Sequence, residues 1–134
     1  MADVVIDTDV ASFLQKNRAP EWVHEAIRGA RIWLTFVTVG EPSKWAVVRR
    51  WGDTRRDRLD LWVARRPVIP YDREIAGRWG ELAGTAQLRG RPRPQNDTWI
   101  AACCVRHEVP LVTLNSADFK DFADSNGLIL LSAT

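Results

Sequence analysis

Short apolar segments alternate with segments of helical periodicity along this chain of 134 residues, and this alternation restricts the fold most. The apolar segments predict strands at residues 4–6, 31–37, 67–70, 111–114 and 128–131. Strands that are nearly all apolar are typical of a parallel sheet that helices cover on both sides. We therefore expect an α/β fold with three layers. A chain of this length can bury one core, so residues 1–134 are expected to form a single domain.

Between the strands, apolar residues at intervals of three and four predict helices. These helices are expected at residues 10–15, 20–27, 38–51, 53–66, 72–89, 97–107 and from 117. Asp72 is expected to cap its helix, and Asp9 to lie at the positive end of the first helix. Pro67 and Pro70 flank the third strand, which favours a place at the sheet edge.

Four acidic residues lie where a strand ends or a helix begins. Asp7, Glu41 and Asp118 each follow a predicted strand within a few residues. Asp97 lies in the first turn of a predicted helix. In an open α/β sheet the ligand site lies outside the carboxyl ends of the strands, where the strand order reverses. We therefore expect these four carboxylates to meet at one edge of the sheet.

The helix that begins at Asp97 carries a stripe that is expected to be buried, formed by Ile100, Cys103, Cys104 and His107. Neighbouring helical cysteines point in different directions, so they do not predict a disulfide framework. The two histidines are far apart in sequence and the chain has no C-x-x-C motif. A zinc site is therefore not expected.

Carboxylates that gather in one place repel one another unless cations neutralise them. Oxygen ligands without histidine or cysteine favour Mg²⁺ or Mn²⁺, which can activate water for phosphodiester cleavage. Sixteen of the 19 basic residues are arginine, and Arg89, Arg91 and Arg93 lead into the Asp97 segment. Because arginine is the side chain best suited to phosphate, the pattern predicts a metal-dependent nuclease. The alternative is that the arginines only solvate helix faces.

Helix capping offers a second interpretation of the same acids. Thr38 and Glu41 fit a capping box, in which the glutamate reaches back to the first backbone donor of the helix. Asn115 and Asp118 have the same spacing. Asp7 differs, because the residues after it would cap the following helix and leave Asp7 without a structural role. Capping alone therefore stays an alternative for Glu41 and Asp118.

The N-terminal segment has no basic start and no long apolar run, so we expect a cytoplasmic protein without membrane contact. A net charge of +2 is too small to indicate a partner. The helices with Trp45, Trp51 and Trp62 carry more aromatic surface than a small monomer readily buries, which predicts a homodimer. Trp99, two residues after Asp97, either borders the site or packs away from it.

Four segments resemble the signatures of PIN-domain ribonucleases, and more narrowly those of the VapC toxins of bacterial toxin–antitoxin pairs. They are VVIDTDV, TFVTVGE, GRPRPQNDTWIAA and LVTLNSADF, in that order, and the similarity extends over essentially the whole chain. The resemblance implies a PIN-like five-stranded parallel sheet flanked by helices. It implies a Mg²⁺-dependent endoribonuclease that cleaves structured RNA such as tRNA or rRNA with a metal-activated water. It also implies a homodimer and a VapB-like antitoxin whose C-terminal segment blocks the active site.

By position, the resemblance assigns the first three acids of the family. They are Asp7, Glu41 and Asp97, which we expect to act as catalytic residues and metal ligands. The fourth position of the family is Asn115 here, and Asp118 three residues later is the acid expected at the metal. Which of these two completes the site is left open by the sequence.

Thr8 and Asn115 are expected to support the metal ligands from outside the coordination sphere, and Arg89, Arg91 and Arg93 would bind RNA. Two other functions stay open. One is a PIN-domain nuclease of RNA processing, which an upstream antitoxin gene and growth arrest would argue against. The other is a non-catalytic nucleic-acid-binding module, whose RNA affinity would be indifferent to removal of the acids.

Overall fold

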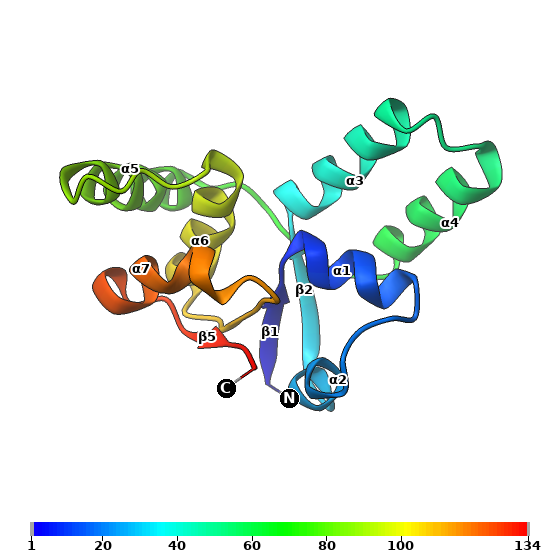
Figure 1. Ribbon diagram of the computed structural model, residues 1–134, viewed down its shortest axis with the longest axis horizontal. Coiled ribbons are helices and arrows are strands. Elements are labelled where there is room, and N and C mark those ends of the chain that lie inside the picture. The colour runs from blue at the N-terminus through cyan, green and yellow to red at the C-terminus, as the bar shows by residue number, and fades with distance from the viewer. Residues whose placement is uncertain (1, 134) are drawn as a thin grey trace.

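The sheet has β1 (Asp3–Ile6) at its centre (Figure 1). The computed structural model describes residues 2–133, and its strands are all parallel, in the order β3-β2-β1-β4-β5. The other strands are β2 (Arg31–Thr35), β3 (Val68–Ile69), β4 (Leu111–Val112) and β5 (Leu130–Leu131). The predicted α/β class and the five parallel strands are confirmed. The proline-flanked strand β3 lies at an edge, as its missing backbone donors require.

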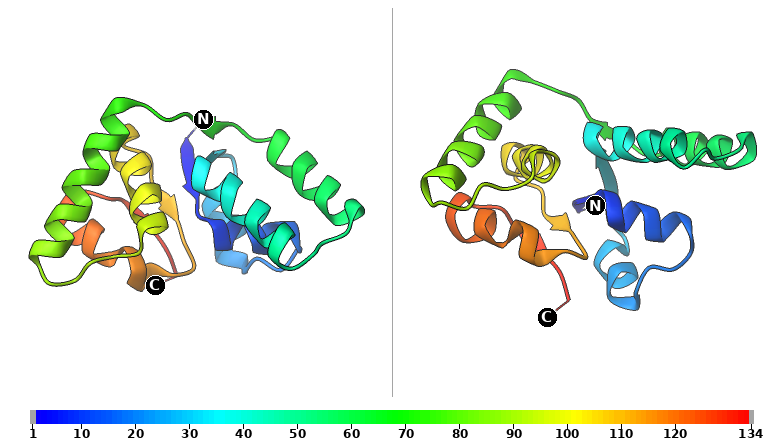
Figure 2. Two further views of the ribbon diagram at one scale, coloured as in Figure 1. Left: turned by 90° about the horizontal axis from the view of Figure 1, so that it is seen from above. Right: turned by 45° about the horizontal axis from the view of Figure 1, so that its top comes forward.

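Helices cover both faces of the sheet (Figures 1 and 2). One face carries α5 (Arg73–Leu88), α6 (Gln95–His107) and α7 (Ser116–Asn126). The other face carries α1 (Thr8–Gln15), α2 (Glu21–Ile27) and the end of α4 (Asp53–Ala64). Helix α3 (Phe36–Val48) leaves the carboxyl end of β2 and projects from the sheet beside α4. The three layers expected from the sequence are therefore present.

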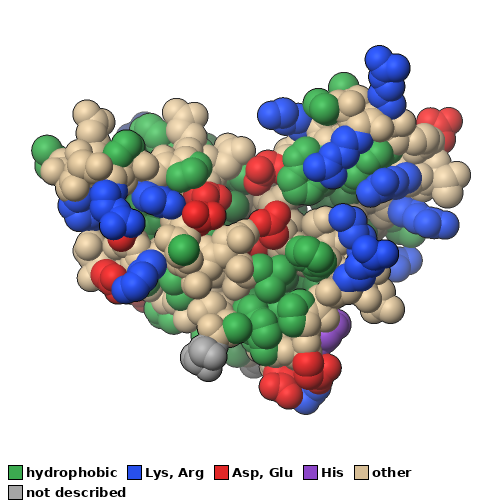
Figure 3. All heavy atoms as spheres, in the orientation of Figure 1, with side chains coloured by type: hydrophobic (Ala, Val, Ile, Leu, Met, Phe, Trp, Pro, Cys, Tyr) green, Lys and Arg blue, Asp and Glu red, His purple; other side chains and the backbone are tan. Residues whose placement is uncertain are grey.

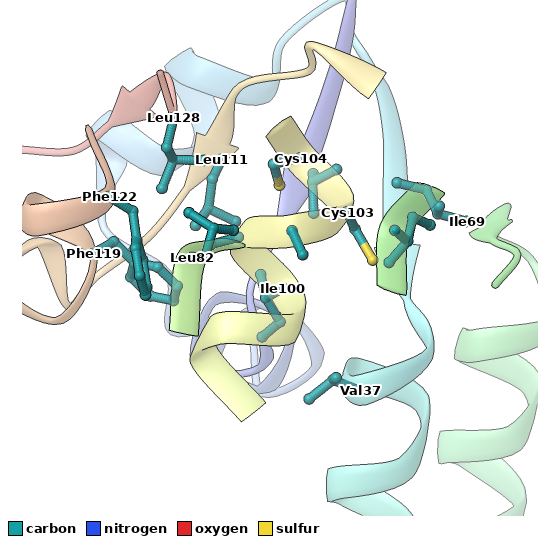
Figure 4. Packing of buried hydrophobic residues seen from close by; sticks show 14 of the residues in the cluster. Val37, Ile69, Leu82, Ile100, Cys103, Cys104, Leu111, Phe119, Phe122 and Leu128 are labelled. Atoms are coloured by element: carbon teal, nitrogen blue, oxygen red, sulfur yellow. The ribbon is translucent and has the colours of Figure 1, made fainter. Parts of the chain in front are cut away.

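Side chains along each strand alternate between two hydrophobic cores, because successive residues of a strand point to opposite faces. Val5 and Leu111 belong to the core beneath α5, α6 and α7, where Phe119 and Phe122 are almost wholly buried (Figure 4). Ile6, one residue along β1 from Val5, belongs to the core on the opposite face. Burial on both faces explains why the strands read as continuous apolar runs.

Some sequence-based boundaries are wrong. Strand β2 ends at Thr35 and α3 begins at Phe36, whereas the sequence predicted a strand to residue 37. Helix α6 begins at Gln95, two residues before its predicted start. His107 is exposed rather than buried, because it lies in the last turn of α6, where the helix leaves the core. Helix α3 continues without interruption through Pro42.

The two cysteines are structural residues of the core. Cys103 and Cys104 are buried free thiols (Figure 4). Burial raises the pKa of Cys103 to about 12 and that of Cys104 well above its usual range, so both are protonated at neutral pH. Among the helices of residues 2–133, none combines the length and the apolar character needed to cross a membrane.

Candidate active site

The carboxyl ends of β1 and β4 open onto a small cavity of ≈ 90 Å³. Strand β1 pairs with β2 on one side and with β4 on the other, so the strand order reverses at this point. Ligands of open α/β sheets bind at such a reversal. The cavity therefore lies where the fold itself favours a functional site.

Five carboxylates line this cavity, which we call the acid site. Its lining residues are Asp7, Thr8, Asp9, Glu41, Asp97, Ile100, Asn115, Asp118 and Phe119. Acidic side chains gather near the middle of the face shown in Figure 3, with lysines and arginines on either side. The structure thus brings the four predicted acids together and adds Asp9 to them.

Asp7 is buried and makes two structural contacts. Its Oδ1 accepts a hydrogen bond from the Val10 N–H at 3.0 Å, which makes Asp7 the N-cap of α1. Its Oδ2 accepts a hydrogen bond from the Thr113 hydroxyl at 2.6 Å. Burial is the main cause that raises the pKa of Asp7 to about 6, and the Asp9 and Asp97 carboxylates contribute to the rise. The two hydrogen bonds lower the pKa without cancelling this effect. The sequence-based view that Asp7 has no structural role is therefore wrong.

Glu41 lies in the second turn of α3 and does not cap the helix. The N-cap is Thr35, whose hydroxyl accepts a hydrogen bond from the Thr38 N–H at 3.4 Å. The Oε1 of Glu41 instead accepts a hydrogen bond from the Thr8 hydroxyl at 2.7 Å. The hydroxyls of Thr8 and Thr38 lie 3.0 Å apart. The capping-box interpretation of Glu41 is therefore wrong, and Thr8 holds its carboxylate at the acid site.

Asp97 lies in the first turn of α6, as the sequence predicted. Burial, together with the carboxylates of Asp118, Glu41 and Asp9, raises the pKa of Asp97 to about 6. The guanidinium of Arg93 acts in the opposite direction without cancelling the rise. The charges gathered around Asp97 are therefore only partly compensated by the protein.

Asn115 and Asp118 stand at the start of α7 but do not form a capping box. The Asn115 N–H donates to the Thr113 hydroxyl at 2.9 Å and is not available to Asp118. The Asn115 side-chain amide donates to the Asp9 carboxylate. The Oδ1 of Asp118 accepts a hydrogen bond from Nη2 of Arg93 at 3.3 Å, within an ion pair. The capping interpretation of Asp118 is therefore also wrong.

Sequence reasoning missed two residues of this site, Asp9 and Thr113. Asp9 lines the acid site, and Thr113 bonds both Asp7 and the backbone of Asn115. Each stands two residues from a predicted site residue at the end of a strand. Asp9 lies in the first turn of α1 and Thr113 directly follows β4, so closeness in sequence to the predicted site residues was the available signal.

Two of the three arginines predicted to bind RNA contact α7. Arg91 Nε contacts Asp121 Oδ2 at 3.0 Å, and Arg93 contacts Asp118. Arg89 is the exposed C-cap of α5. Two of the three guanidinium groups are thus paired with carboxylates, and RNA binding by this segment stays a prediction.

The donor set of the acid site fits a hard divalent cation. Its ionisable groups are all carboxylates, and a hydroxyl and an amide supply further oxygen atoms. Within residues 2–133, no group of three or more Asp, Glu, His or Cys side chains is arranged to hold a metal ion. Mg²⁺ does not need one, because it keeps several waters and binds one or two carboxylates. Burial is the main cause of the raised pKa values of Asp7 and Asp97, and neighbouring carboxylates add to the rise.

Trp99 packs away from the acid site, which answers the question that the sequence left open. Its ring stacks on Trp79, with centroids 5.0 Å apart and an interplanar angle of 18°. Phe36 contacts the same ring edge-on at a centroid distance of 5.8 Å. Trp99 therefore joins α6 to α5 and α3 rather than bordering the carboxylates.

The chain is similar in sequence to a known domain family and to proteins named as ribonucleases. Residues 4–125 match the PIN domain family. The chain is 28% identical over 123 residues to Ribonuclease VapC1 of Haemophilus influenzae strain R2866, covering 90% of this chain and 92% of that protein. It is 30% identical over 125 residues to Ribonuclease VapC5 of Mycobacterium tuberculosis, covering 92% of this chain and 87% of that protein.

Solved structures share the fold over nearly the full length. VapBC-1 from nontypeable Haemophilus influenzae has a TM-score of 0.83 at 26% identity and covers 97% of both chains. VapBC2 from Rickettsia felis, bound to a promoter DNA fragment, has a TM-score of 0.82 at 18% identity and covers 98% of this chain and 99% of that one. The resemblance seen in the four sequence segments is confirmed, and the chain belongs to the PIN-domain family.

Proposed function

We propose that this chain is a VapC-type endoribonuclease toxin that uses a divalent cation, Mg²⁺ or Mn²⁺, at the acid site. The observation that carries the proposal is the convergence of five carboxylates on one cavity at the point where the strand order reverses. Relatives named as VapC ribonucleases, at 28% and 30% identity, support RNA as the substrate. The proposed substrate is a structured RNA such as tRNA or rRNA, and the proposed compartment is the cytoplasm.

Asp7 and Asp97 are the proposed principal metal ligands, because both combine burial with repulsion from neighbouring carboxylates. Glu41 and Asp118 would complete the site directly or through water. A bound divalent cation lowers the pKa of a coordinated water and offsets charge that develops on phosphate oxygens.

The protein's own contribution is to hold these carboxylates in place before RNA arrives. The Thr113 hydroxyl and the backbone at the start of α1 fix one oxygen each of Asp7. The Thr8 hydroxyl fixes one oxygen of Glu41. Side chains oriented in advance need little rearrangement when the substrate binds, which is how positioned groups contribute to rate.

A VapB-like antitoxin is the proposed partner, and a homodimer the proposed assembly. Similar structures include VapBC-1, VapBC2 and VapBC-5 from Mycobacterium tuberculosis, the last a member of the VapBC family of toxin–antitoxin systems. Co-purification with the product of a neighbouring small gene tests the partner, and sedimentation at micromolar concentration tests the dimer.

The test of the nuclease compares three metal-stripped proteins on total bacterial RNA, followed by sequencing of new 5′ ends. Wild type with Mg²⁺ or Mn²⁺ is expected to produce a few discrete ends, and wild type in EDTA none. Asp97→Asn is expected to produce none with either metal. Asp124→Asn is the matched control, because Asp124 is an exposed residue of α7 that pairs with Lys120 outside the acid site. Equal cleavage by the Asp97→Asn protein would refute the assignment of the site.

Induced expression in a bacterial host separates a toxin from a nuclease of routine RNA processing. Wild type is expected to arrest growth, whereas Asp7→Asn, which keeps an N-cap side chain for α1, is expected to leave growth unchanged. Cleavage in vitro without growth arrest in the host would retain the nuclease and refute the toxin.

A further inference from the structure

We infer that a groove between α1, α3 and α4 binds a single-stranded segment of the RNA substrate next to the acid site. This inference rests on the proposed nuclease function and deepens it, because it assigns a place to the RNA that flanks the cleaved bond. We call the groove the tryptophan groove. Its volume is ≈ 580 Å³, and the residues that carry the argument are Lys16, Trp45, Trp51, Arg55, Arg58 and Trp62.

The tryptophan groove carries positive charge that the fold leaves free. None of the ion pairs within residues 2–133 involves Lys16, Arg55 or Arg58, and no acidic residue lines the groove. Arg91 and Arg93, by contrast, are both paired with carboxylates. Figure 3 shows lysine and arginine side chains over α3, α4 and α1, to the right of the acidic side chains. Cations without a counter-charge on one surface attract an anionic ligand.

Aromatic rings line the same groove as these cations. Trp45, Trp51 and Trp62 are partly exposed and line the groove, and the Arg55 guanidinium lies 3.7 Å from the centre of the Trp51 ring. A single-stranded nucleic acid alternates phosphates with flat bases, and such strands bind where basic groups accompany aromatic stacking surfaces. The presence of arginine and tryptophan in one groove therefore matches a nucleic acid strand in both charge and shape.

The tryptophan groove adjoins the acid site along α1 and α3. Pro42 lines the groove and directly follows Glu41, which lines the acid site. Ser12 lines the groove one helical turn after Thr8, which lines the acid site. One turn of helix rises about 5 Å, so the groove and the carboxylates lie close enough for one RNA strand to contact both.

Arg56 holds the wall of the groove although it does not line the groove itself. Arg56 donates hydrogen bonds to the carbonyl oxygens of Trp51 and Ala46, both at 3.0 Å. These bonds fix the corner between α3 and α4. The groove is therefore a formed surface rather than a gap between independent helices.

The test measures binding of fluorescein-labelled oligouridylate of about 12 nucleotides in EDTA, where metal-dependent cleavage cannot occur. The double variant Arg55→Gln/Arg58→Gln changes two exposed side chains outside the acid site. We expect its affinity to fall about tenfold at roughly 50 mM salt, and the slope of log K against log salt to fall by about 1.4 for two lost phosphate contacts. Arg73→Gln/Arg78→Gln on α5 removes the same charge far from the groove and is expected to change neither quantity (Figure 1).

A second variant separates stacking from charge. Trp45→Leu is expected to weaken oligouridylate binding at least about fivefold with the salt slope unchanged, because stacking releases no counterions. Wild-type affinity and slope in the Arg55→Gln/Arg58→Gln protein would overturn the inference. If the variants instead changed the sedimentation coefficient, or capture by a co-expressed antitoxin, at constant RNA affinity, the groove would be a protein-docking surface and the inference would be wrong.

The outcomes also separate the groove from the nuclease. Groove-dependent binding in EDTA, combined with no cleavage when metal is added, would refute the proposed function and retain the groove. If instead the protein cleaved RNA with metal and both variants bound oligouridylate as wild type does, the proposed function would be retained and the groove refuted.

Discussion

Replacing Asp97 with asparagine is expected to stabilise the metal-free protein and to abolish RNA cleavage. Burial and the neighbouring carboxylates raise the pKa of Asp97 from 3.8 to about 6, so the ionised side chain costs folding free energy at neutral pH. Asparagine keeps the size of the side chain and removes the charge. The substitution is therefore expected to remove a proposed metal ligand and to raise the stability of the metal-free protein, because functional sites often cost stability.

The size of this effect follows from the change in pKa. About two pKa units at roughly 1.4 kcal/mol each set a limit near 3 kcal/mol. Asp97 is partly exposed, and solvent screening reduces the expected gain to about 1 kcal/mol. For a domain of this length, that gain corresponds to a rise of about 3 to 5 °C in Tm.

The pH dependence has a defined sign. The folded chain binds more protons at Asp97 than the unfolded chain does between pH 3.8 and about 6. The contribution of this carboxyl to stability is therefore greatest below pH 3.8 and is lost as the pH rises through about 6. Relative to Asp97→Asn, wild type should lose about 1 kcal/mol over this window and no more above it.

Urea denaturation in EDTA at several pH values, for wild type, Asp97→Asn and the control Asp124→Asn, measures these differences. Adding Mg²⁺ is expected to stabilise wild type by about 2.7 kcal/mol at a hundred times Kd and to leave Asp97→Asn unchanged. An Asp97→Asn protein that is less stable than wild type in EDTA at pH 7 would show that the acid site carries no excess negative charge.

Three further predictions concern the surroundings of the site and the core. Thr113→Val removes the hydroxyl that donates to Asp7, and urea denaturation at pH 7 should show a loss of about 1 to 3 kcal/mol. The same variant should raise the pKa of Asp7 further, as followed by NMR titration of its carboxyl. Phe122→Ala leaves a cavity in the core beneath α7 and should cost about 3 to 5 kcal/mol in the same denaturation assay. Cys103 and Cys104 should resist a thiol reagent such as dithionitrobenzoate until urea unfolds the chain, because burial keeps both protonated.

The elements of the fold could be predicted because they depend on local composition. Val4, Val5 and Ile6 read as a strand buried on both faces, and the structure places Val5 in one core and its neighbours in the other. The end of the next strand was harder to predict. Thr35 and Thr38 both suit an N-cap by composition, and only pairing of Thr35 with Ile69 of β3 fixes where the strand stops.

The capping assignments show where a single sequence fails. Asp7 was expected to have no structural role, yet it is the N-cap of α1. Glu41 and Asp118 were expected to fit capping boxes, yet neither caps a helix. A capping motif specifies which side chains can reach a backbone donor, but a competing partner from another element decides which one does. For Glu41 that partner is Thr8, 33 residues away.

The sequence by itself determined the order of strands and helices along the chain and the parallel sheet. It also determined that acidic residues lie near the carboxyl ends of strands. These features follow from periodicity and spacing along the chain. Only the tertiary structure decided which hydroxyl orients which carboxylate, as in the bond of Thr113 to Asp7 across 106 residues. It also decided that Arg93 is neutralised whereas Arg55 is not. The physical reason is that burial, charge compensation and hydrogen-bond competition depend on distances between elements, which local patterns do not contain.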